Sequence, residues 1–287
     1  MESRKYVAPM GMESLPRQNA SSLFLGSVAG KSSKAYLGMD MLTKHIIMVG
    51  RSGAGKTTTA MIIAEECLMH SLTVIVLDVS KRWPNFNYKC DSESMLKAYR
   101  RFGMESPKSF AAKEMAITKE CVHINLVDSI ERGALNFFNL TKLDQGQFNE
   151  FACRSAQELI AACGKETKKL RTLVIIDDAY KLSPRFGGNA VATLEDARYR
   201  LKDSGTALML ITHSLIDFAP FGLGSIGTEI WFKTSQTEDY ERARRRFGPE
   251  YAALLPSLRT GEGMIANIDY NYGRPWFVEF RPLYHKR

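Results

Sequence analysis

Residues 50–57, with the sequence GRSGAGKT, constrain the fold more than any other stretch of this chain. They match the pattern G-x-x-x-x-G-K-[ST], in which backbone N–H groups of a glycine-rich loop and of the following helix surround phosphate groups. The apolar run at 46–49 predicts a buried strand before the loop, and the residues from Thr57 to about Met69 predict a helix after it. The sequence therefore predicts a nucleotide-binding P-loop.

Each residue of this loop has an expected part in binding. Lys56 can reach the β- and γ-phosphates of a nucleoside triphosphate, and the hydroxyl group of Thr57 can ligate Mg²⁺. We therefore expect ATP and Mg²⁺ as cofactors. The predicted nucleotide-binding residues are Gly50, Arg51, Ser52, Gly53, Ala54, Gly55, Lys56, Thr57 and Thr58.

Strand and helix patterns alternate along the chain, which predicts an α/β domain with a mostly parallel sheet flanked by helices. Strands are expected at 46–49, 72–78, 173–177, 207–212 and 228–233, and helices at 57–69, 147–163, 190–202 and 238–246. Residues 1–21 are expected to form a flexible arm and 22–287 one domain. That domain is expected to hold a β-hairpin within 22–41, a helical insertion at about 88–121, a short strand at 122–125, and two last strands at 263–269 and 276–281.

Polar side chains follow two of the predicted strands. Asp177 and Asp178 end the strand at 173–177, where one carboxylate can bind Mg²⁺ and its water shell and the next can act as general base toward an attacking water. We assign Asp177 to the metal and Asp178 to the base; the alternative is that the pair caps a helix. His213 ends the next strand and can sense the γ-phosphate, although a structural histidine is an equally good interpretation.

Five segments together resemble the HerA/FtsK superfamily of P-loop ATPases. They are HIIMVGRSGAGKT at 45–57, LVIIDDAYKL at 173–182, GTALMLITHS at 205–214, and LRTGEGMI followed by PWFVEFRP at 258–265 and 275–282. The resemblance covers residues 22–283. It implies a RecA-like fold of the additional-strand type and ATP hydrolysis between the subunits of a ring, typically a hexamer. Members of the superfamily move DNA as helicases, as conjugative or type IV secretion ATPases, or as viral genome-packaging ATPases.

The chain departs from the superfamily pattern at three positions. Asp178 replaces the usual glutamate, and His213 replaces the usual glutamine. The position of the arginine that reaches a neighbouring subunit's phosphates is taken by Lys202, and Arg198 and Arg200 lie just before it. We expect Arg200 or Lys202 to supply this cation, with Arg200 preferred. The short segment before residue 44 brings the chain nearer to the packaging and secretion members.

The formal net charge of +8 favours a polyanionic partner, and double-stranded DNA is expected from the resemblance. The segment 81–86, with the sequence KRWPNF, combines two cations with two aromatic rings. It can contact a DNA backbone or stack on bases, or it can be a solvated loop above core aromatics. Lys181 and Arg185 are a second candidate DNA contact, whereas the charged helix 238–246 mixes both signs and favours a solvated or subunit-interface face. A membrane channel or a capsid portal is a further expected partner.

Other observations narrow the setting. The five cysteines have no metal or disulfide spacing, and no apolar run is long enough to span a membrane, so we expect a cytoplasmic protein. The stretch 141–144, TKLD, fits a guanine-specificity pattern, but the D-x-x-G that should precede it is missing. Two alternatives to a DNA motor stay open: a secretion-type ATPase that acts on protein cargo, and a nucleotide-binding module whose hydrolysis is impaired.

Overall fold

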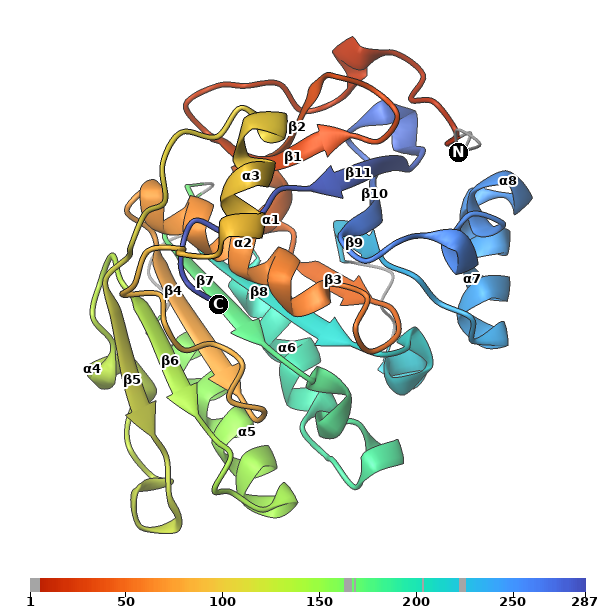
Figure 1. Cartoon of the computed structure of the whole chain (residues 1–287). Coiled ribbons are helices and arrows are strands. Elements are labelled where there is room, and N and C mark those ends of the chain that lie inside the picture. The colour runs from red at the N-terminus through yellow and green to blue at the C-terminus, as the bar shows by residue number, and fades with distance from the viewer. Residues whose placement is uncertain (1–5, 163–166, 168, 203, 222–225) are drawn as a thin grey trace.

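The computed structural model describes residues 6–162, 167, 169–202, 204–221 and 226–287 (Figure 1). Cys163, which we expected to end the helix at 147–163, lies outside the described residues. The strands of the described part are β1 (Ser22–Val28), β2 (Lys34–Gly38), β3 (Ile46–Val49), β4 (Thr73–Asp78), β5 (Ala112–Ala116), β6 (Leu135–Asn139), β7 (Thr172–Ile176), β8 (Thr206–Thr212), β9 (Thr228–Trp231), β10 (Glu262–Asn267) and β11 (Trp276–Phe280). The α-helices of the same residues are α1 (Met39–Thr43), α2 (Lys56–Met69), α3 (Glu93–Phe102), α4 (Leu126–Ser129), α5 (Gln145–Ala161), α6 (Val191–Leu201), α7 (Thr237–Phe247) and α8 (Pro249–Ala252).

Within the described residues these strands form one 11-stranded sheet in the order β2-β1-β11-β10-β9-β3-β8-β7-β4-β6-β5. The strands from β9 to β5 in this order run parallel. Strand β8 lies between the P-loop strand β3 and the acid-bearing strand β7, which is the additional-strand arrangement that the sequence predicts. The predicted α/β class with a mostly parallel sheet is confirmed.

The two predicted hairpins extend this sheet with antiparallel strands. Strand β1 pairs with β2 and with β11, and β10 pairs with β11 and with β9. The start and the end of the domain therefore lie side by side, at the upper edge of the sheet in Figure 1. Residues 6–21, the expected arm, run along this edge, where the Met10 N–H donates to Asn271 Oδ1 at 2.8 Å and Leu15 is buried.

Helices cover both faces of the sheet, as the continuous apolar runs of the parallel strands require. One core packs α2 against the face that Val74 and Val76 of β4 share. The other core packs α5, α6 and α7 against the opposite face, which includes Ile75 and Leu77 of the same strand. Figure 1 shows α2 in front of the sheet and α5 and α6 behind it.

The region at 88–125 differs from expectation. It contains the helix α3, but residues Ala112–Ala116 form the edge strand β5 beside β6, and residues 122–125 form a turn. Strand β5 gives no apolar alternation because Lys113 and Glu114 are exposed at the sheet edge. Strand β6 escaped prediction because Asn136 and Asn139 interrupt its apolar residues; the amide of Asn136 is satisfied by the backbone of Glu131 and Ala134.

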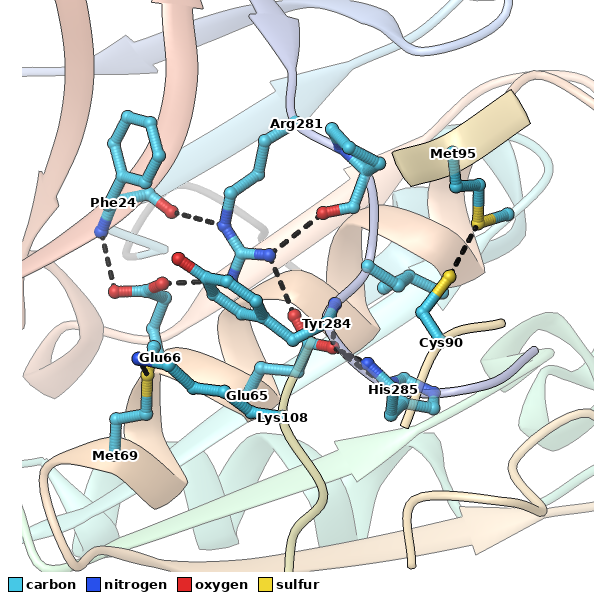
Figure 2. A network of polar contacts seen from close by, with 12 residues as sticks. Phe24, Glu65, Glu66, Met69, Cys90, Met95, Lys108, Arg281, Tyr284 and His285 are labelled. Atoms are coloured by element: carbon cyan, nitrogen blue, oxygen red, sulfur yellow. Dashed lines mark hydrogen bonds and ion pairs between the residues drawn. The ribbon is translucent and has the colours of Figure 1, made fainter. Parts of the chain in front are cut away.

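A buried charge cluster fastens the segment after β11 to helix α2 (Figure 2). Arg281 is fully buried and donates to Glu65 Oε2 at 2.7 Å and to Glu66 Oε1 at 2.8 Å. Its Nε also donates to the carbonyl of Phe24 at 3.1 Å, and His285 Nδ1 lies 2.7 Å from Glu65 Oε1. These contacts join α2, β1 and the last residues of the chain into one packed unit.

Across the part of the chain that the structure describes, every helix is too short or too polar to cross a membrane.

Candidate functional site

The P-loop connects β3 to α2, and its backbone follows the path that its glycines permit. Gly50, Gly53 and Gly55 have φ angles of 151°, 74° and 109°, a region in which side chains are strained. A Cβ atom at Gly50 would lie 2.7 Å from the Cβ of Phe232, so this position also has no space for a side chain. The spacing of glycines in the motif is therefore explained by backbone conformation and by packing.

Lys56, the first residue of α2, folds back over this loop. Its Nζ donates to the carbonyl oxygen of Gly50 at 2.6 Å and of Arg51 at 3.1 Å. Burial lowers the pKa of Lys56 to about 8, against the opposing charges of Asp178 and Asp177. The ammonium group thus lies in a poorly solvated position, where an anionic phosphate would interact strongly with it.

The structure brings both acids to the start of α2. Asp177 follows β7, and the Thr57 hydroxyl donates to its Oδ2 at 3.1 Å. Burial raises the pKa of Asp177, and the neighbouring charge of Asp178 raises it further. A hydroxyl oxygen and one carboxylate side by side are the hard oxygen ligands that Mg²⁺ accepts while it keeps most of its waters. The residues present therefore fit a nucleotide-bound Mg²⁺.

Asp178 occupies a left-handed backbone position, with a φ of 56°, and its carboxylate is almost fully buried. His213 follows β8 and lies between the P-loop and this acid. Its Nε2 is 3.7 Å from Asp178 Oδ1, and its Nδ1 is 3.4 Å from Lys56 Nζ. Burial and then the charge of Lys56 lower the pKa of His213, so the imidazole is neutral at pH 7. The side chain thus touches both groups that we expected to act on the phosphates.

Lys56, Thr57 and His213 line a pocket of about 280 Å³. Six of the expected loop residues line it together with four residues from elsewhere in the chain: Ser52, Gly53, Gly55, Lys56, Thr57 and Thr58 from the loop, and Arg82, His213, Thr260 and Arg287. Thr260 donates to the carbonyl oxygen of Gly53 at 3.2 Å. Sequence reasoning missed Thr260 and Arg287, because only the pairing of β10 and β11 with the rest of the sheet brings them to the P-loop.

The loop after β4 is also part of the site. We considered its aromatic residues as a platform for bases, but Trp83 and Phe86 are both fully buried, so the core interpretation is correct. Trp83 Nε1 donates to Asp177 Oδ2 at 3.1 Å. Arg82 Nη2 lies 3.5 Å from Asp178 Oδ2, and Ser80 Oγ donates to the same oxygen at 2.6 Å.

Arg200 and Lys202 lie at the other end of the parallel strands from the P-loop. They precede β8, whereas the P-loop and His213 follow their strands, so the length of the parallel strands separates the two groups within one chain. Arg200 is exposed and lies 3.3 Å from Asp196. Lys202 lines a second pocket of about 450 Å³ together with Lys44 and Arg246. The structure thus brings Lys56, Thr57, Asp177, Asp178 and His213 together, and it leaves Arg200 and Lys202 apart from them.

The P-loop follows β3, the oxygen ligand Asp177 follows β7, and the polar residue His213 follows β8, which lies between these two strands. This arrangement defines a P-loop nucleoside triphosphatase of the additional-strand class. The family model described as "Helicase HerA, central domain" matches residues 23–217, more than half of the sequence. The chain belongs to this family and is an ATPase of the HerA/FtsK type.

Solved structures resemble the chain over most of its length, whereas no curated protein matches it. VirB4 of Thermoanaerobacter pseudethanolicus is 13% identical, with a TM-score of 0.62, and the match covers 92% of this chain and 97% of that one. The plasmid coupling protein TrwB, solved in complex with the non-hydrolysable GTP analogue GDPNP, is 11% identical, with a TM-score of 0.56 and coverage of 92% and 90%. The genome packaging NTPase B204 from Sulfolobus turreted icosahedral virus 2, in complex with ATP-gammaS, is 16% identical, with a TM-score of 0.49 and coverage of 83% and 96%. The first two likenesses establish the shared fold.

Proposed function

We propose that this protein is a motor subunit that moves double-stranded DNA, and that it hydrolyses ATP between the subunits of a homo-oligomeric ring, with a hexamer as the expected form. The proposal depends on one observation: charged groups gather at both ends of the parallel strands. The phosphate-binding groups gather at the edge where β3, β7 and β8 end, and basic side chains gather where these strands begin. Head-to-tail packing of such subunits would bring one subunit's cations to the next subunit's nucleotide.

In this proposal the P-loop holds the triphosphate. Backbone amides of residues 50–58 and the start of α2 bind the phosphate oxygens, and Lys56 exchanges its carbonyl partners for the β- and γ-phosphates. Thr57 and Asp177 would hold Mg²⁺, which when bound neutralises negative charge on the transferring phosphate. The direct hydrogen bond between these two side chains supports a shared ligand at this position.

Asp178 is the proposed general base. It orients a water molecule whose oxygen attacks the γ-phosphorus while the bond to the bridging oxygen of the leaving ADP breaks, and it accepts the proton that this water loses. His213 is neutral and lies within 4 Å of both Asp178 and Lys56, which supports a proposed role in which it transmits loss of the γ-phosphate from one to the other. Asp178 is one methylene shorter than the glutamate usual in the superfamily, and we expect slower turnover as a result.

Arg200 or Lys202 is the proposed cation that acts on the neighbouring subunit. A cation at this point stabilises the charge that develops on the transferring phosphate, and Arg does so with a planar set of donors that Lys lacks. Arg200 lies 3.3 Å from Asp196, and both side chains are exposed to solvent, so this ion pair costs little to break.

The net charge and the family support DNA as the proposed cargo. A net charge of +8 favours a polyanion, and Lys181 and Arg185, on the surface after β7, are proposed to contact the phosphate backbone of DNA. We propose that the ring works in the cytoplasm against a membrane channel or a capsid portal.

The decisive experiment measures ATP turnover with and without duplex DNA, together with the native mass in the presence of a non-hydrolysable ATP analogue. We expect a ring whose ATPase rate rises with duplex DNA, and a Lys56→Ala variant that hydrolyses no ATP. DNA binding should weaken steeply as salt increases, because released counterions drive it. A flat salt response, or stimulation by a protein substrate alone, would contradict DNA as the cargo and favour the secretion alternative.

A further inference from the structure

The loop that follows β4 is held in place by a buried carboxylate. Asp78, the last residue of β4, is fully buried, and its Oδ1 accepts the N–H of Ser80 at 2.7 Å. Its Oδ2 accepts the N–H of Arg82 at 2.7 Å and of Trp83 at 3.3 Å. Three backbone hydrogen bonds to one carboxylate fix the path of residues 79–83 before any ligand binds.

This fixed loop presents three side chains to the two acids of the site. The hydroxyl of Ser80 and the guanidinium of Arg82 both approach Asp178 Oδ2, at 2.6 Å and 3.5 Å. The indole of Trp83 donates to Asp177 Oδ2 at 3.1 Å. The neutral side chains of Ser80 and Trp83 thus form direct hydrogen bonds with the two acids. The guanidinium of Arg82 makes a longer and more exposed contact with Asp178.

Arg82 also faces the nucleotide pocket. Its side chain is 45% exposed, whereas that of Asp178 is 4% exposed, and Arg82 lines the pocket beside Lys56 and His213. A guanidinium carries five N–H donors in a planar fork that matches phosphate oxygens, so a contact between one of its amino groups and Asp178 leaves donors for a second anion.

We propose that Arg82 is a catalytic cation of its own subunit's site, which contacts the phosphate groups of the bound nucleotide and stabilises the charge that develops on them during hydrolysis. The inference rests on the proposed hydrolysis at this P-loop. It replaces the DNA contact that the sequence permitted for Arg82, since the guanidinium is directed to the acids and the pocket. Besides Lys56, the site would then draw one cation from the loop after β4 and one from the neighbouring subunit.

The test compares Arg82→Ala and Arg82→Lys with Lys81→Gln in the full chain. Lys81 is the matched control, because it is an exposed cation of the same loop that does not line the pocket. Single-turnover ATP hydrolysis without DNA is measured first, followed by the Kd of a fluorescent ATP analogue and by the salt dependence of duplex binding.

We expect Arg82→Ala to lower the hydrolysis rate constant about 100-fold, the effect of removing one donor to a developing oxyanion. Arg82→Lys should recover part of this loss, because it restores the charge but not the fork. Lys81→Gln should stay within about twofold of the wild type, and Arg82→Ala should leave the salt dependence of DNA binding unchanged. Because Arg82 is half exposed, thermal melting of all three variants should match that of the wild type.

Two results would overturn the proposal. One is hydrolysis by Arg82→Ala within about twofold of the wild type in the absence of DNA. The other is loss of DNA affinity with a smaller salt slope in Arg82→Ala at unchanged hydrolysis, which would make Arg82 a phosphate contact to DNA. If the wild type itself hydrolyses no ATP, the proposed function fails, and the nucleotide Kd still decides on Arg82: Arg82→Ala should weaken binding about tenfold and Lys81→Gln should not.

Discussion

Replacement of Arg281 by Met should destabilise the fold more than any surface substitution of the same type. The guanidinium of Arg281 is fully buried and binds two carboxylates, Glu65 at 2.7 Å and Glu66 at 2.8 Å. Met has a similar length and no polar atoms, so the substitution removes the charge with little change in volume. Glu65 Oε2 and Glu66 Oε1 would both lose their charged partner inside the protein.

The magnitude follows from the burial of these carboxylates. Removing one partner of a buried ion pair typically costs about 3–5 kcal/mol, because the remaining charge is left desolvated and unpaired. Both acids keep other donors: Glu65 Oε1 accepts the N–H of Tyr284, and Glu66 Oε2 accepts that of Phe24. We therefore expect a cost within this range rather than twice as large.

Chemical denaturation with urea measures this cost, and Arg101→Met supplies the control. Arg101 forms an ion pair with Glu279, but its side chain is 63% exposed, so its removal should cost less than about 1 kcal/mol. Adding Glu65→Gln and Glu66→Gln to Arg281→Met should restore part of the loss, since Gln accepts the same backbone N–H groups without a charge. Equal costs for Arg281→Met and Arg101→Met would refute the claim that buried charge fastens the chain end to α2.

The cost should also depend on pH. Burial raises the pKa of Glu66, and the charge of Arg281 opposes this effect. In Arg281→Met the pKa of Glu66 rises further, so the folded state binds a proton more readily than the unfolded state. Such a carboxylate destabilises the fold fully above its folded pKa. The penalty shrinks as pH falls below that value and is gone only below the pKa of the unfolded state. Denaturation midpoints of the variant and the wild type should therefore converge as the solution becomes more acidic.

Three further predictions concern the nucleotide site. Phosphate binding should raise the pKa of Lys56 above its value of about 8 in the free protein, so nucleotide binding should take up a proton above about pH 8. Calorimetry in buffers of different ionisation enthalpy measures this proton uptake, and the nucleotide affinity should fall as pH rises. Asp178→Asn should lower kcat at least about 100-fold with little effect on nucleotide Kd, since a general base acts in the transition state; an equal loss in both would show a binding role instead. Trp83→Phe keeps the buried ring but removes the donor to Asp177, so Mg²⁺-dependent turnover should fall while Mg²⁺-free nucleotide binding stays the same.

Local patterns predicted the parallel half of the sheet well. The runs around β3, β4, β7 and β8 are continuously apolar and end in loops with glycine, carboxylates or histidine, so both their class and their functional edge could be read from the sequence. The two strands beyond β4 were harder to predict, because β5 is polar on an exposed edge and β6 buries two asparagines whose partners are fixed only by tertiary contacts.

Residues of the candidate site that belong to a local motif could be predicted from the sequence. Residues that strand pairing brings to the pocket could not. The motif after β3 singled out Lys56 and Thr57, and the end of β7 singled out Asp177. The structure brings these side chains together, and their roles stay predictions. Thr260 and Arg287 reach the pocket only because β10 and β11 pair with strands far away in sequence.

Helix α2 links the chemistry to the rest of the molecule. Its first residue, Lys56, contacts the P-loop, and two turns later Glu65 and Glu66 bind Arg281 and the backbone of β1. Because these carboxylates are buried and paired, sliding of α2 along β1 would separate opposite charges in a medium of low dielectric constant. We infer that the P-loop helix and the antiparallel half of the sheet move as one body. In the proposed ring, nucleotide-dependent motion would then be absorbed at the surfaces between subunits, where Arg200 and its exposed partner Asp196 could exchange contacts at little cost.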